Sequence, residues 1–162
     1  MTAPTHGDHR SPPSFVVLGI FLLVVIGVGA LIGTQSTPGV WYQNLEMPPF
    51  NPPNWLFGPV WFILYAMIAV AGWRIWSENP SGGAMKLWFA QMVFNWAWSP
   101  IWFIGQMLWP AFAVIVVLLA LIIAFIVVAR RTDRLASWLF VPYLAWVSFA
   151  SLLNLSIAVL NA

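Results

Sequence analysis

Long apolar segments are the feature that most limits what this chain can fold into. Residues 15–33 form an uninterrupted apolar run of 19 residues, and residues 110–129 are almost entirely Val, Leu, Ile and Ala. A helix of about 20 such residues crosses the hydrocarbon core of a bilayer. Charged residues make up 6% of the chain, whereas a soluble domain carries about 25%. The sequence therefore predicts an integral membrane protein.

The spacing of the apolar segments predicts an all-α fold, a bundle of five transmembrane helices. These helices are expected at about residues 15–33, 52–76, 84–104, 110–129 and 135–160. They form one membrane domain, residues 15–160, preceded by a polar N-terminal tail, residues 1–14. The first segment is longer than a signal-peptide core, which favours a retained helix.

The positions of the basic residues predict how the chain is oriented. Cytoplasmic loops carry an excess of Lys and Arg. The connections after the first and third helices hold no basic residue. All six lie in the N-terminal tail, in the turn after the second helix with its flanks, or in the turn after the fourth helix: Arg10, Arg74, Lys86, Arg130, Arg131 and Arg134. We therefore expect a multi-pass protein of a bacterial inner membrane, with a cytoplasmic N-terminus and an external C-terminus.

The connection between the first two helices, residues 34–54, is unusually rich in proline. Thr37-Pro38 predicts a short helix that runs to about Glu46. Four prolines follow, and each restricts φ and removes an amide donor, so the segment is stiff: Pro48, Pro49, Pro52 and Pro53. Its aromatic residues offer flat faces with polar edges. We interpret this lid loop as a cover over a flat, mostly apolar ligand.

Indoles and amides share one face of the helix at 84–104. They are three or four residues apart and so lie in one row: Trp88, Gln91, Asn95, Trp98 and Trp102. Amides are costly in lipid, so this face points inward. The helices at 52–76 and 135–160 carry similar rows: Trp61 and Tyr65, and Trp146, Ala150 and Asn154. These rows predict a cavity between helices, or else ordinary interhelical packing and hydrogen bonding.

Several kinds of site are disfavoured. The chain has no Cys, and no His lies in an apolar segment, so a haem there would lack its usual axial ligands. No charged residue lies in the middle of a span, which argues against an ion-coupled transporter. His6 and His9, with Asp8 between them, are too few to predict a metal site. Gly29 and Gly33 form a face for close helix contact, within the chain or in a dimer.

Three motifs together resemble the TspO/MBR family, the translocator proteins or tryptophan-rich sensory proteins. The resemblance covers nearly the whole chain. The motifs are Trp41-Tyr42-x-x-Leu45 with Pro48 and Pro52-Pro53, followed by Phe57 and Trp61; Ala90-Gln91-x-x-x-Asn95-x-x-Trp98-Ser99-Pro100; and Val141-Pro142-Tyr143-Leu144-x-Trp146 with Leu153-Asn154.

This resemblance implies a five-helix protein, usually a homodimer, with a ligand cavity beneath the lid loop. It implies porphyrin or haem as the ligand, the lipid bilayer as surroundings, and neither a required cofactor nor nucleic acid. The residues that the resemblance places around the ligand are Trp41, Tyr42, Pro53, Phe57, Trp61, Asn95, Trp98, Trp146, Ala150 and Asn154. The dimer would form through the helix at 84–104 or through the Gly29 and Gly33 face.

Three functions follow from the resemblance. The first is tetrapyrrole binding for transport, buffering or stress sensing. The second is light-dependent porphyrin degradation that uses Trp41, Trp61 and Trp146. The third is a membrane scaffold that acts through a partner protein. Two departures matter: residues 47–50 read Met-Pro-Pro-Phe where the family often has Lys-Pro-x-Trp, and residues 154–160 lack the Tyr and basic residue of a sterol motif.

Overall fold

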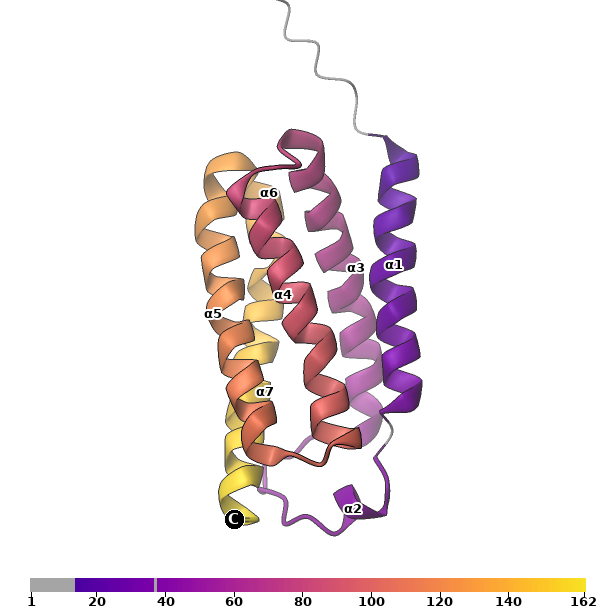
Figure 1. Cartoon of the computed structure of the whole chain (residues 1–162), viewed down its shortest axis with the longest axis vertical. Coiled ribbons are helices and arrows are strands. Elements are labelled where there is room, and N and C mark those ends of the chain that lie inside the picture. The colour runs from indigo at the N-terminus through magenta and orange to yellow at the C-terminus, as the bar shows by residue number, and fades with distance from the viewer. Residues whose placement is uncertain (1–13, 37) are drawn as a thin grey trace, which may run out of the picture.

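The computed structural model describes residues 14–36 and 38–162. The described residues are almost entirely helical, and their long helices lie side by side along one axis, with α2 at one end and α6 near the other (Figure 1). The elements are α1 (Phe15–Gln35), α2 (Val40–Gln43), α3 (Asn54–Glu78), α4 (Gly83–Ser99), the π-helix η1 (Pro100–Ile104), α5 (Leu108–Thr132), α6 (Arg134–Leu139) and α7 (Val141–Leu160).

Four helical segments are long and apolar enough to cross a membrane: α1, α3, α5 and the combined α6–α7 segment Arg134–Leu160. The predicted class, an all-α integral membrane protein, is confirmed. The remaining one of the five predicted spans, the helix at 84–104, is divided in the structure. Its first part, α4, has 17 residues and continues as the five-residue η1.

Pro100 explains where the expected helix at 84–104 changes form. Proline has no backbone N–H and cannot bond to the carbonyl four residues earlier. The chain widens into a π-helix at this point, and the Gly105 amide donates to the Pro100 carbonyl over 2.9 Å. Gln106 then adopts φ 54°, in the left-handed region, and reverses the chain toward α5.

The single helix expected at 135–160 is in fact two helices, α6 and α7, that meet at Phe140. Pro142 lies in the first turn of α7, where its missing N–H does no harm, but it prevents α6 from continuing. Asp133 caps α6, since its Oδ1 accepts from the Ala136 amide over 3.0 Å. Its Oδ2 lies 2.8 Å from Nε of Arg74, which ties α6 to the end of α3.

The lid loop also differs from the prediction. The short helix α2 begins at Val40 after an N-cap at Gly39 and ends at Gln43, so it is shorter than the expected helix. Thr37 lies outside the described residues, as do the tail residues before Ser14 with their two histidines. The next helix, α3, begins at Asn54 rather than at residue 52.

The core lies between α3, α4, α5 and α7, and α1 packs on the outside against α3. Gly29 of α1 allows this close packing, because a Cβ at that position would overlap the ring of Tyr65. A Cβ at Gly33 would meet nothing within 4 Å. The close contact expected of this glycine face is therefore made within the chain at Gly29.

Candidate functional site

A small enclosed cavity lies between α3, α4, α5 and α7. Its volume is about 20 Å³. The nine residues that line it are Phe57, Trp61, Asn95, Trp98, Ile115, Leu118, Trp146, Val147 and Ala150. Six of the ten residues predicted from the sequence are in this set, and their role in ligand binding stays a prediction.

Four of the nine residues that line the cavity are aromatic, and each contacts another ring. The rings of Phe57 and Trp146 meet edge to face, with centroids 5.7 Å apart and planes at 71°. Trp61 lies 5.2 Å from the ring of Tyr65, one helical turn further into the bundle. Trp98 stacks on Trp102 at 5.9 Å and 18°. The rings of the wall therefore come from three helices, and each is in contact with at least one other ring.

Next to this wall, a series of side-chain hydrogen bonds, the buried hydrogen-bonded chain, joins α3, α4 and α7. Tyr65 donates to Oδ1 of Asn95 over 3.1 Å, and Nδ2 of Asn95 donates to the Tyr143 hydroxyl over 2.7 Å. Tyr143 donates in turn to Oε1 of Gln91 over 3.1 Å. The inward-facing amides thus bond to neighbouring helices, which was the second interpretation of the indole and amide row. Asn95 reaches the cavity with both ends of its amide already bonded.

Asn154 is close to the cavity but does not line it. Its Oδ1 accepts from the Trp98 indole over 3.1 Å, and its Nδ2 donates to the Leu108 carbonyl over 3.2 Å. The side chain therefore orients a wall residue and ties α7 to the start of α5. Asn154 is therefore a positioning residue for Trp98 and is not among the residues that line this cavity, and its role in ligand binding stays a prediction.

Trp41 and Tyr42, the two aromatic residues of the lid loop that were expected to contact the ligand, pack against η1. The ring centroid of Trp41 lies 6.2 Å from that of Trp102, and Tyr42 lies 5.6 Å from Phe103. Burial raises the pKa of the Tyr42 phenol. Pro53 is an exposed N-cap residue of α3. None of these three residues lines the cavity, and Trp102 of η1 contacts both Trp41 and the wall residue Trp98.

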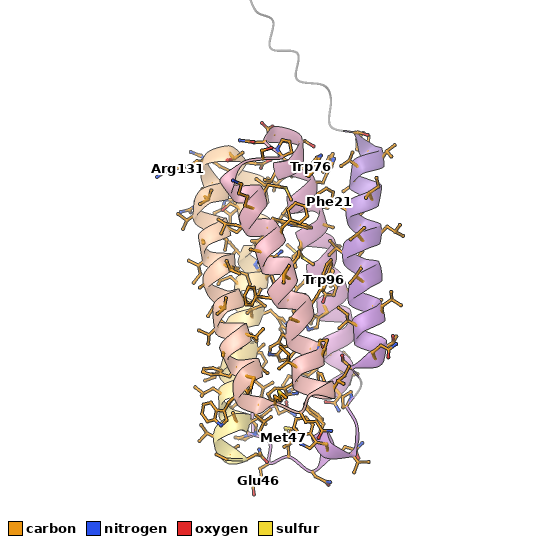
Figure 2. All side chains as sticks on the ribbon, in the orientation of Figure 1. Phe21, Glu46, Met47, Trp76, Trp96 and Arg131 are labelled. Carbon is orange, nitrogen blue, oxygen red and sulfur yellow. The ribbon has the colours of Figure 1, made fainter. Side chains whose placement is uncertain are left out.

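The lid loop is fastened to the end of α7 by one side chain. Oδ1 of Asn161 accepts from the Glu46 amide over 2.9 Å, and its Nδ2 donates to the Glu46 carbonyl over 3.0 Å. Phe50 adds an edge contact with Phe149, with centroids 6.4 Å apart. Figure 2 shows Glu46 and Met47 at this end of the molecule and Arg131 at the opposite end.

Three wall residues were missed by the sequence prediction: Ile115, Leu118 and Val147. Two of these residues lie in the segment predicted as the span at 110–129, to which no site residue was assigned from the sequence. In the structure the buried residues of α5 follow a three-and-four spacing, and two of them reach the cavity. No local signal separates them, since their neighbours in α5 are equally apolar.

The cavity as it stands is closed to any large ligand. A volume of about 20 Å³ has room for about one water molecule, whereas small-molecule sites measure about 300–1,000 Å³. A flat conjugated ring would require the wall side chains to move apart. Within residues 14–36 and 38–162, no three His, Cys, Asp or Glu side chains gather as metal ligands.

Comparison with known proteins agrees with this architecture. The TspO/MBR family model matches residues 18–160. The chain is 35% identical over 144 residues to the tryptophan-rich sensory protein of Cereibacter sphaeroides, covering 89% of this chain and 91% of the relative. It is 33% identical over 154 residues to the translocator protein of Ovis aries, covering 89% of each chain.

A third relative is the tryptophan-rich protein TspO of Chlorobaculum tepidum, which is 35% identical over 150 residues and matches 90% of this chain and 95% of its own. The matches extend across all the membrane helices of the chain, including the indole and amide row of α4. The chain therefore belongs to the TspO/MBR family.

Proposed function

We propose that this membrane protein binds a porphyrin-type tetrapyrrole, porphyrin or haem, in the cavity, for transport, buffering or stress sensing. One observation carries the proposal: the cavity wall combines three indoles and a phenyl ring, from Trp61, Trp98, Trp146 and Phe57. Aromatic side chains stack on, or meet edge to face, a flat conjugated ring.

The chemistry of the wall also favours one mode of binding. None of the nine lining residues is a His, Cys or charged residue, so the ring would be held by stacking and shape rather than by axial metal ligation. Metal-free protoporphyrin should therefore bind about as tightly as haem. The ring would displace the edge contact between Phe57 and Trp146 as the cavity widens.

Quenching of Trp fluorescence by protoporphyrin in the dark tests the proposal. Wild type in lipid nanodiscs should show saturable quenching. The double variant Trp61→Leu, Trp146→Leu should bind at least about fivefold more weakly, since each lost stacking contact is worth about 0.5–1.5 kcal/mol. Trp138→Leu is the matched control, because this side chain is 61% exposed on α6. Equal affinity of the double variant and wild type would overturn the proposed site.

Light-dependent degradation of the porphyrin is the second candidate function. It is favoured by the contact of the cavity residue Trp61 with the rings of Tyr65 and Tyr143, at 5.2 and 6.2 Å. Trp61 and Trp146 are the candidate redox partners of the excited ring, whereas Trp41 lies away from the cavity. Illumination of the bound complex should then bleach the porphyrin band in wild type and leave it stable in Trp61→Phe, Trp146→Phe. A stable band in wild type would exclude degradation, and failure of every tetrapyrrole to bind would favour a scaffold.

We also propose the fifth membrane span and the orientation expected from the sequence. Residues 83–104 of α4 and η1 reach about 30 Å, enough to cross the hydrocarbon core. The basic residues of the described chain flank α3, α4, α5 and α6 at the end away from the lid loop: Arg74, Lys86, Arg130, Arg131 and Arg134. This supports a bacterial inner-membrane protein with this end in the cytoplasm.

A homodimer is part of the same proposal, tested by the mass of the solubilised protein.

A further inference from the structure

An open groove lies on the outside of the bundle, between α3 and α7. Its volume is about 510 Å³, and every residue that lines it is apolar: Pro52, Leu56, Val60, Leu64, Pro142, Ala145, Trp146 and Phe149. Both helices are membrane spans. The groove therefore opens toward the acyl chains of the bilayer rather than toward water.

The packing of the helices explains why the groove exists. α3 packs against α1, α4 and α6, while α7 packs mainly against α5. α6 packs against α3 at the end away from the lid loop. Nearer the lid loop, α3 and α7 do not pack closely together. From Leu56 to Leu64 the groove follows α3 for about 12 Å, from the lid end into the membrane.

One side chain is shared by this groove and the cavity. Trp146 lines both spaces. Its indole is held by ring contacts, to Phe57 at 5.7 Å and 71° on the cavity side and to Phe149 at 5.7 Å and 41° on the groove side. Rotation of this one indole would join the groove to the cavity.

A second route to the cavity would lead past the lid loop, but the lid loop is held more strongly than Trp146. Opening it breaks two hydrogen bonds between Asn161 and Glu46 and pulls Trp41 and Tyr42 away from η1. Moving Trp146 breaks its two ring contacts and its packing against the core, but among the described residues it breaks no side-chain hydrogen bond. A mostly apolar ring dissolved in the bilayer also meets the groove directly, without passing through water.

We propose that the groove is a lateral portal through which the tetrapyrrole ring passes between the bilayer and the cavity, with Trp146 as its movable wall. The inference rests on the proposed function, since it names the route to that same site. It assigns the groove residues other than Trp146 a role in the rate of binding rather than in the bound complex.

Filling the groove tests the portal. Ala145 is an exposed residue that lines the groove and not the cavity, so Ala145→Phe should block the passage while leaving the cavity wall in place. In stopped-flow quenching with protoporphyrin-loaded vesicles in the dark, both association and dissociation should slow at least about tenfold. The equilibrium Kd should stay within about twofold, because only the barrier is raised.

Two further variants complete the test. Ser148→Phe adds the same ring to an exposed position of α7 that does not line the groove, and it should match wild type. Trp146→Ala removes the movable wall and should speed association, which a merely misfolded protein would not do; dissociation should speed as well, because a stacking contact of the bound ring is also lost. Asn161→Ala loosens the lid loop and so probes the other route.

The outcomes separate the portal from the proposed function. Saturable binding with rates that neither Ala145→Phe nor Trp146→Ala changes would overturn the portal alone. Faster association in Asn161→Ala with no effect of Ala145→Phe would assign the route to the lid loop instead. A wild-type protein that shows no saturable quenching would overturn the tetrapyrrole function and the portal together.

Discussion

At the residue scale, Tyr143 is the junction of the buried hydrogen-bonded chain. Its hydroxyl accepts from Asn95 and donates to Gln91, and the side chain is fully buried. Tyr143→Phe would leave Nδ2 of Asn95 and Oε1 of Gln91 without this partner in the membrane interior. We expect the free energy of unfolding to fall by about 1–3 kcal/mol, measured by thermal unfolding in detergent. Tyr65→Phe removes one bond only and should cost less; equal losses would show that the chain does not act as described.

Gly29 illustrates how a missing side chain can matter. A Cβ here would overlap the Tyr65 ring, and that ring carries the hydroxyl bonded to Asn95. Overpacking of this kind costs about 1–3 kcal/mol, more than the helix propensity that alanine gains. Gly29→Ala should therefore lower the unfolding midpoint in detergent. At Gly27 a Cβ meets nothing within 4 Å, so Gly27→Ala is the control and should be neutral or stabilising.

At the scale of elements, the lid loop depends on the C-terminal end of α7. Asn161 bonds both the amide and the carbonyl of Glu46, 115 residues away in the chain. Losing two hydrogen bonds worth about 0.5–1.5 kcal/mol each should raise the population of the opened lid loop by about fivefold or more. Hydrogen exchange of residues 40–50 in Asn161→Ala measures this. Ser156→Ala is the control, since its hydroxyl bonds within α7 to Leu152; equal exchange in both variants would contradict the prediction.

At the scale of the whole molecule, the number of spans decides where the two termini lie. Five spans place them on opposite sides of the membrane, and four would place them on the same side. The chain has no cysteine, so single substitutions report position cleanly. In intact spheroplasts an impermeant maleimide should label Ala162→Cys and Asn44→Cys but not Ser14→Cys or Ser81→Cys. Labelling of Ser14→Cys together with Ala162→Cys would refute the fifth span.

Much of the architecture was predictable because it depends on local composition and spacing. Apolar segments identify membrane helices, and the repeat of Trp88, Gln91 and Asn95 identifies an inward face of α4, since lipid excludes amides. Six cavity residues follow from such rows together with the family motifs. The ends and breaks of helices were less predictable: Pro100 and Pro142 both lie near a helix terminus, but one widens the helix and the other begins a new one.

By itself, the sequence determined the membrane class, the approximate helices, the stiff lid loop and the family, because each is a property of composition, period or motif. Only the tertiary structure decided which partner each side chain meets. It directed Asn154 to Trp98 rather than to the cavity, and it packed Trp41 against η1. It also selected Ile115 from many equivalent apolar residues of α5. The physical reason is that these outcomes depend on how helices pack across the bundle, which spacing along one helix does not encode.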